Sequence, residues 1–223
     1  MPGSRPESVE RGGLDVTDKD PLRTYHGKRD FGRTGEPRGR SGGGGAEPRF
    51  VVQIHDASTM HFDFRLQVGD VLKSWSVPKG PSTDPGDKRL AVPTEDHPLE
   101  YEEFEGVIPE GEYGGGTVIV WDHGTYRPLS HDRRGRPVPF DEALDHGHIT
   151  FRLHGTKLHG AYALTRFRGG SGGRGEAWLL VKTKEGGTRT TGRATPDPRR
   201  ARSVRSGRTL HQVAAAARGA DGR

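Results

Sequence analysis

The stretch that decides the fold is IHDASTMHFDFRL, residues 54–66. In its second half, polar side chains alternate with apolar ones: His61, Phe62, Asp63, Phe64, Arg65 and Leu66. Because successive side chains of a β-strand point to opposite faces, this alternation predicts a strand with one aromatic, core-facing side. Burying a polar group without a partner costs about 1–3 kcal/mol. The polar side is therefore expected to face water, a ligand or a metal ion.

His55 stands six residues before His61. In one straight strand the two would lie about 20 Å apart, so the intervening DASTM must bend if both are to bind one metal ion. Histidine and aspartate are good ligands for divalent cations, and arginine suits phosphate. Such a set fits metal-assisted phosphoester hydrolysis. Spacing alone favours a plainer interpretation, in which His61 and Asp63 pair with Arg65 on a solvated face.

Outward from this stretch, short strand-like runs rich in alternating, β-branched and aromatic residues fill most of the chain. These runs cover residues 49–56, 61–68, 71–78, 89–96, 116–126, 148–155, 160–167 and 176–183. Turn signals rich in glycine, proline and aspartate separate them. Inside this region only 141–147 looks helical. The pattern predicts an all-β fold, a small closed or partly closed β-barrel with short helices and disordered basic tails.

The expected organisation follows from composition. Residues 1–24 are predicted to be a disordered N-terminal segment, and 25–184 the barrel domain, with a flexible glycine-rich linker at 39–47. Residues 185–223 are predicted to be a basic, mostly disordered tail. Its end, 207–219, could form a short helix whose packing partner the sequence does not identify.

Charge and composition narrow the function. The chain has 223 residues, 35 glycines, no cysteine and a net charge of +5. The lack of cysteine excludes disulfides and cysteine-bound metal sites. Ten Lys/Arg against three Asp/Glu in 183–223 leave the remainder at about −2. A basic tail suits phosphate-backbone attraction, although a solubilising tail fits equally well. No apolar run approaches the roughly 20 residues of a membrane span, so a cytoplasmic, nucleoid-associated protein without membrane contact is expected.

Three other segments carry candidate residues. In RLAVPTEDHPLEY (89–101), His97 lies near Glu95 and Tyr101 and could contact a phosphoryl oxygen, or simply be a satisfied turn histidine. The glycines of residues 111–116 lack the Lys-Ser/Thr of a phosphate-binding Walker loop, so a hairpin is favoured. In KRDFGRTGEPRG (28–39), the charged residues alone would be interpreted as surface groups.

Taken together, the ordered motifs resemble a known family. They are H-D-A-x-x-x-H-x-D-x-R from His55, V-P-K-G-P from Val77, K-R-L-A-V from Lys88, E-D-H-P-L-x-Y from Glu95 and G-V-I-P-E-G-E-Y-G-x-G-T-V from Gly106. The chain resembles, over about residues 25–184, the 3′-phosphoesterase module of bacterial DNA ligase D. The resemblance implies a small β-barrel with a polar crevice.

The resemblance also implies roles for particular residues. By this similarity, His55, His61 and Asp63 hold a divalent metal, expected to be Mn²⁺, and Arg65, His97 and Tyr101 bind the phosphate. The N-terminal segment adds three residues to the implied catalytic set: Arg29, Asp30 and Glu36. The resemblance extends to three substrate contacts in the middle of the module: Lys79, Arg89 and Glu95.

The implied activity is DNA 3′-end healing for non-homologous end joining. The family removes a 3′-terminal ribonucleoside to leave a 3′-phosphate, and then removes that phosphate to leave 3′-OH. The chain is expected to act as a stand-alone module, since 223 residues cannot also hold ligase and polymerase domains. DNA ends are the expected partner, with Ku and a separately encoded ligase or polymerase expected by analogy. The basic tail would tether the barrel to DNA.

Two alternatives remain open from the sequence. The first is a non-catalytic DNA-end-binding subunit of a repair ligase, which would not need three metal ligands. The second is a metal phosphoesterase acting on RNA ends or on small phosphoesters.

Overall fold

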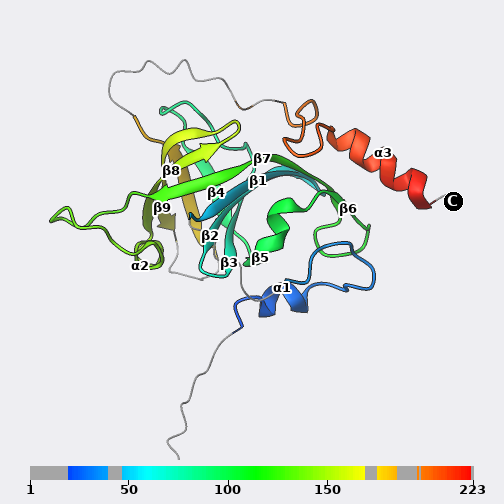
Figure 1. The fold of residues 1–223 in the computed structure, drawn as a ribbon, viewed down its shortest axis with the longest axis horizontal. Helices are drawn as coiled ribbons and strands as arrows, with labels where there is room; N and C mark the ends of the chain where they lie inside the picture. Colours follow the sequence, from blue (N-terminus) through cyan, green and yellow to red (C-terminus); the bar gives the residue numbers. More distant parts are fainter. Residues whose placement is uncertain (1–19, 40–46, 169–174, 185–194, 196, 222–223) are drawn as a thin grey trace, which may run out of the picture.

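A closed antiparallel barrel of eight strands forms the centre of the protein in the computed structural model (Figure 1). The structure describes residues 20–39, 47–168, 175–184, 195 and 197–221. The barrel strands are β1 (Arg49–Asp56), β2 (Met60–Val68), β3 (Val71–Val77), β4 (Arg89–Pro93), β7 (Gly116–Pro128), β8 (His148–Gly155), β9 (His159–Arg168) and β10 (Ala177–Lys182). They pair in the order β1-β2-β3-β4-β10-β9-β8-β7, and pairing of β1 with β7 closes the barrel. The predicted all-β barrel is confirmed, and each barrel strand falls on one of the eight predicted runs.

Two short strands lie outside the barrel's closed path. β5 (His97–Pro98) pairs with β3, and β6 (Gly106–Ile108) pairs with β7. A 3₁₀ helix, η1 (Leu99–Glu103), connects β5 to β6. Because β5 is held against β3, the loop that carries His97 is fixed beside the barrel wall instead of moving freely.

The barrel interior confirms the alternation predicted for the opening stretch. Facing residues of β1 and β2 interlock across the hairpin, with Ile54 opposite Phe62, Val52 opposite Phe64 and Phe50 opposite Leu66. All six are buried in the same hydrophobic cluster. Burying an aliphatic or aromatic side chain stabilises the fold by about 1.5–3 kcal/mol. The intervening residues of both strands must consequently face outward.

A second, smaller cluster covers part of the outer face of the barrel. Helix α1 (Arg23–Gly27) and η1 pack there, and Tyr25, Leu99 and Tyr101 are buried against the sheet residues Val51 and Val120. The Tyr25 hydroxyl donates to the Pro37 carbonyl at 2.6 Å. This anchoring differs from the expected disorder of 1–24 at its end, since α1 begins at Arg23. Residues 1–19, and 40–46 of the predicted linker, lie outside the described residues.

The C-terminal segment differs from its prediction. Helix α3 (Leu210–Asp221) lies beside β6 and β7 (Figure 1), and Ala201, Leu210 and Val213 are buried in the barrel's cluster. The expected mostly disordered tail is therefore wrong for 197–221. The reason is local: Leu210, Val213, Ala214 and Ala217 recur at helical spacing and form an apolar stripe. Residues 185–194, 196 and 222–223 of the predicted tail lie outside the described residues.

The remaining helix, α2 (Phe140–Asp145), matches the helix predicted at 141–147. It precedes β8 and packs Ala143 into the core cluster. Among the described residues, no helix is long and apolar enough to cross a membrane.

Candidate active site

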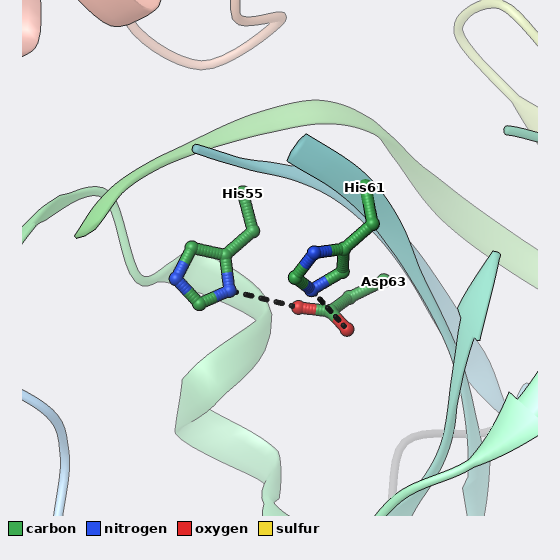
Figure 2. A group of neighbouring side chains, drawn as sticks. All are labelled: His55, His61 and Asp63. Carbon is green, nitrogen blue, oxygen red and sulfur yellow. Dashed lines mark ion pairs between the residues drawn. The ribbon is translucent and has the colours of Figure 1, made fainter. Parts of the chain in front are cut away.

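The β1–β2 hairpin brings the two histidines of the opening stretch together. His55 on β1 lies directly opposite His61 on β2, and their ring centroids are 4.9 Å apart. Both project from the outer side of the barrel, because their neighbours Ile54 and Phe62 fill the interior. The bend predicted for DASTM is thus the hairpin turn itself. Asp63, two residues along β2, points to the same place (Figure 2).

The three side chains form a compact set of possible ligands. Their nearest ligand atoms all lie within 4.8 Å of one another. The His55 Nδ1 atom is 3.6 Å from Asp63 Oδ2, and the His61 Nε2 atom is 3.7 Å from Asp63 Oδ1 (Figure 2). These separations are longer than strong hydrogen bonds. The ligand atoms of the three side chains therefore surround a common point.

The far nitrogens of both rings are occupied. His55 Nε2 lies 2.8 Å from the Gly114 carbonyl, and His61 Nδ1 lies 2.8 Å from the Thr59 carbonyl. A carbonyl only accepts, so these nitrogens carry the ring protons. Each ring then presents a lone pair toward Asp63, which is how metal-binding histidines are usually oriented. Two imidazoles and a carboxylate are therefore compatible with a divalent metal ion.

Asp63 is held in its charged form. Burial alone would raise the pKa of its carboxyl, but the adjacent Arg65 guanidinium offsets this, and the pKa lies well below its usual range. Arg65 Nη2 donates to Asp63 Oδ2 at 3.0 Å. A buried carboxylate that stays ionised keeps its lone pairs available to a cation.

Arg65 is itself buried and extensively bonded. Its Nε donates to Gln53 at 2.9 Å, and Nη1 donates to Ser74 at 2.8 Å and contacts His97 Nδ1 at 2.9 Å. With the bond to Asp63, each of its three nitrogens donates at least one hydrogen bond within the protein. The guanidinium is therefore fixed in place before any substrate arrives.

His97 lies between two arginines. Arg65 Nη1 is 2.9 Å from its Nδ1 atom, and Arg29 Nη2 is 3.4 Å from its Nε2 atom. Burial lowers the pKa of His97 well below its usual value, and the charges of Arg65 and Arg29 lower it further. The imidazole is consequently neutral at physiological pH.

The N-terminal segment completes the site from outside the barrel. The buried Glu36 accepts hydrogen bonds from Arg29 Nε at 2.9 Å, from the Tyr101 hydroxyl at 2.9 Å and from the Thr34 hydroxyl at 3.0 Å. Arg29 also bonds Glu95 at 3.1 Å. Burial would raise the pKa of Glu95, but its own backbone N–H, Lys28 and Arg29 lower it overall. Glu36 thus positions Arg29 and Tyr101 from behind.

These groups line one pocket of about 270 Å³, which we call the catalytic pocket. Its lining residues are Arg29, His55, Ala57, Ser58, His61, Asp63, Arg65, Thr94, Glu95, His97, Tyr101, Ile108, Tyr113 and Gly114. Eight of the twelve residues singled out from the sequence are among them, although they come from segments as far apart as 29 and 101.

Four of the singled-out residues do not line the catalytic pocket. Glu36 lies behind it, as described above. Asp30 is exposed and accepts a hydrogen bond from the Gly32 N–H, which stabilises a local turn. Lys79 is exposed in the turn after β3, and Arg89 pairs with Asp87 at 2.7 Å at the start of β4.

Three further residues contribute to the site that were not predicted from the sequence: Gln53, Ser74 and Tyr113. Gln53 is fully buried, accepts from Arg65 and donates to the carbonyls of Tyr101 and Phe104. Its signal was available, because Gln53 lies two residues before His55 on the same side of β1. Ser74 and Tyr113 gave no such signal, since their neighbours in the pocket come from distant parts of the chain.

Comparisons with known proteins identify the family of this chain. The family model described as the DNA ligase D 3′-phosphoesterase domain matches residues 53–166. The multifunctional non-homologous end joining protein LigD of Pseudomonas aeruginosa is 48% identical over 192 residues, which cover 85% of this chain and 22% of that protein. The protein of the same name from Mycolicibacterium smegmatis is 40% identical over 168 residues, covering 74% of this chain and 21% of that protein.

A third relative is the multifunctional non-homologous end joining DNA repair protein LigD of Mycobacterium tuberculosis, 39% identical over 180 residues. That alignment covers 79% of this chain and 21% of the relative. The chain thus spans about a fifth of the length of the curated relatives it matches. The matched residues include His55, His61, Asp63, Arg65 and His97, and the chain belongs to the DNA ligase D 3′-phosphoesterase domain family.

Proposed function

We propose that the protein is a metal-dependent phosphoesterase that heals DNA 3′ ends for repair by non-homologous end joining. It would remove a 3′-terminal ribonucleoside and then the resulting 3′-phosphate, leaving 3′-OH. The observation that carries the proposal is the catalytic pocket, in which two imidazoles, a charged carboxylate and two arginines converge. Family membership supports phosphoester hydrolysis, and the names of the relatives support the repair setting.

The residues that would hold the metal are His55, His61 and Asp63, and Mn²⁺ is the ion we propose. A divalent cation there would supply Lewis-acid polarisation of a phosphoryl oxygen and activation of water. The chain's own contribution is a fixed charge pattern. Asp63 stays ionised, and the ring protons of both histidines are directed away from the shared point by the Gly114 and Thr59 carbonyls.

Arg65 and Arg29 would bind the phosphate. Arg65, held by Gln53, Ser74 and Asp63, would donate to a phosphate oxygen. Arg29 approaches from the opposite side of His97 and lines the same pocket. Two buried cations in a confined site stabilise developing negative charge without having to reorganise.

His97 would act as a neutral hydrogen-bonding group. Burial and the flanking arginines lower its pKa, so at neutral pH it is not the imidazolium that could protonate a leaving group. Tyr101 would support the phosphate site through its bond to Glu36, and Glu95 would position Arg29. Lys79 and Arg89 lie outside the catalytic pocket, so any contact they make would be with DNA away from the scissile phosphate.

The partners follow from the setting. DNA ends are the proposed substrate, and Ku and a DNA ligase or polymerase are proposed co-workers, because the relatives are multifunctional end-joining proteins. Asp30, exposed in its turn, would contribute by shaping the segment that carries Arg29 and Glu36.

The test is product analysis on a 5′-labelled primer–template that ends in one 3′-ribonucleotide. With Mn²⁺, the primer should shorten through a 3′-phosphate intermediate to a 3′-OH end. An all-RNA duplex of the same sequence serves as the comparison. If the protein binds the DNA but never cleaves it, it is a DNA-end-binding subunit. If only the RNA is cleaved, the DNA-repair assignment is wrong.

A further inference from the structure

A separate pocket of about 380 Å³ lies between the tip of the β1–β2 hairpin and the C-terminal segment. We call it the arginine pocket. It is lined by Asp56 and Met60 at the hairpin tip, Thr117 at the start of β7, and Arg199, Leu210, His211, Ala214 and Arg218 of the C-terminal segment. None of these side chains takes part in the chemistry proposed above.

The two arginines of this pocket, Arg199 and Arg218, both belong to the C-terminal segment. Arg199 and Arg218 are exposed, and no ion pair joins either to a carboxylate among the side chains that the structure describes. Arg205, in the same segment, differs because it pairs with Glu103 at 3.1 Å. Asp56 shares the pocket but forms no ion pair with them. Two uncompensated guanidinium groups in one hollow suit an anionic ligand with several oxygens, such as a phosphate.

The arginines are carried by folded structure. On the Arg199 side, the Ala201 N–H donates to the Asp197 carbonyl at 3.1 Å in a turn, and Ala201 is buried. On the Arg218 side, α3 is docked through the buried Leu210 and Val213. Groups that are already ordered lose less conformational entropy on binding than groups on a free tail. A pocket built in this way can bind at a defined place.

The arginine pocket and the catalytic pocket are linked by a third hollow that shares lining residues with each of them. This third hollow of about 590 Å³, the glycine-loop pocket, lies between Ala57 and Ser58 of the hairpin turn and the loop of residues 110–116. It shares Ala57, Ser58, Ile108 and Gly114 with the catalytic pocket. It shares Asp56 with the arginine pocket. The three hollows therefore follow one another around the tip of the hairpin.

The charges along this path differ. The glycine-loop pocket is lined by three acidic residues, Asp56, Glu110 and Glu112. Glu112 pairs with Arg33 at 3.0 Å, so the carboxylates of Asp56 and Glu110 are the ones that repel phosphate. Phosphate oxygens are favoured only at its two ends, beside Arg65 and Arg29 at one and beside Arg199 and Arg218 at the other. A nucleic acid that reaches both ends would place its sugars or bases, and not a phosphate, in the glycine-loop pocket.

We propose that the arginine pocket binds a backbone phosphate of the DNA whose 3′ end lies in the catalytic pocket. The inference rests on the proposed function for the identity of the DNA, but its binding step does not require cleavage. It replaces a diffuse tether with one defined contact, made by Arg199 and Arg218.

The test uses two double variants of the full chain. Arg199→Gln with Arg218→Gln removes the pocket's cations. Arg200→Gln with Arg208→Gln is the matched control: both residues are exposed, belong to the same segment, carry the same charge and lie outside the pocket. Thermal melting of all three proteins checks that the fold is kept.

Affinity for a fluorescent primer–template is measured by anisotropy in EDTA over a range of salt concentrations, so that cleavage does not interfere. The pocket variant should bind on the order of tenfold more weakly, as expected when one charge-assisted interaction is removed. Its log–log salt slope should fall by about 0.9 for each phosphate that the protein no longer neutralises. The control should keep the wild-type affinity and slope. Equal weakening in both variants, or no weakening in either, would overturn the proposal.

A second arm separates a backbone phosphate from a free one. Inorganic phosphate is titrated as a competitor against the bound primer–template. A 3′-phosphorylated dinucleotide is assayed with Mn²⁺, because it is too short to reach both ends of the path. The pocket variant should process the dinucleotide at the wild-type rate. Selective loss of activity on the dinucleotide would place Arg199 and Arg218 in the chemistry and contradict the proposal. If no protein cleaves either substrate, the proposed function fails, while the binding comparison in EDTA still decides this inference.

Discussion

At the scale of single residues, Glu36 shows how the pocket depends on groups that never line it. Its carboxylate is buried and bonds Arg29, Tyr101 and Thr34, so one charge orders side chains from α1's segment and from η1. The sequence placed Glu36 beside Asp30 as similar charged residues of one segment. The two residues differ in the structure, because Glu36 is buried and Asp30 is exposed.

This difference predicts unequal effects of removing each charge. Glu36→Gln should lower kcat on the order of 10- to 100-fold, since a charge-assisted hydrogen bond is worth about 1.5–3 kcal/mol. Asp30→Asn should stay close to wild type, because an amide oxygen can still accept from the Gly32 N–H. Steady-state cleavage of the 3′-ribonucleotide primer measures both. Equal activities of the two variants would show that Glu36 does not position Arg29.

His97 predicts a pH dependence. Its pKa in the folded protein lies below the value of about 6.5 expected in the unfolded chain. The unfolded state thus binds a proton first as the pH falls. The contribution of His97 to stability should be complete above pH ~6.5 and decrease below it. NMR titration of the His97 ring, with a histidine peptide as reference, should show no protonation where the peptide titrates. Parallel titration curves would contradict the neutral role.

At the scale of elements, β7 carries a buried charge that organises the β8–β9 turn. Asp122 is fully buried, and its carboxylate accepts from the N–H groups of Thr156, Lys157 and Leu158 at 2.8–2.9 Å. Burial raises its pKa, while these backbone N–H groups lower it, with a net rise. The sequence predicted only a strand over 116–126 here, and the neighbouring His123 is exposed.

Replacing this carboxylate should loosen the turn. In Asp122→Asn, the amide NH₂ would face at least one backbone N–H that loses its acceptor, which costs about 1–3 kcal/mol. Urea denaturation should show that loss of unfolding free energy. The neighbouring exposed change His123→Gln should leave it nearly unchanged. A wild-type midpoint for Asp122→Asn would mean that the turn does not need the charge.

The elements also show what the sequence could predict. Alternation in 61–66 identified the core side of β2, because a strand's two faces follow directly from residue spacing. The same logic located the eight barrel strands. It did not reveal the docking of α3 or the place of Lys79, since both depend on which distant surfaces meet. Glycine's role at Gly116 was equally hidden: its φ is +148°, and a Cβ there would lie 2.2 Å from the Asp56 carbonyl oxygen.

At the scale of the whole molecule, the barrel acts as a scaffold whose outer wall bears the chemistry. Hairpin β1–β2 supplies His55, His61, Asp63 and Arg65, while α1's segment and η1 close over them. Most residues of this pocket were predicted from the sequence motifs, through the family resemblance that these motifs carry. Spacing alone had favoured a solvated salt-bridged face, and only the three-dimensional pairing of His55 with His61 shows a cation-sized space.

The central claim is that this space is a metal centre that phosphoester hydrolysis requires. The most direct measurement is the cleavage rate of the 3′-ribonucleotide primer against free Mn²⁺ concentration, for wild type, His61→Ala and the exposed control His148→Ala, after circular dichroism has shown that all three are folded. The account predicts saturable activation of the wild type and the control, and no activation of His61→Ala. Activation of His61→Ala equal to that of the wild type would contradict it.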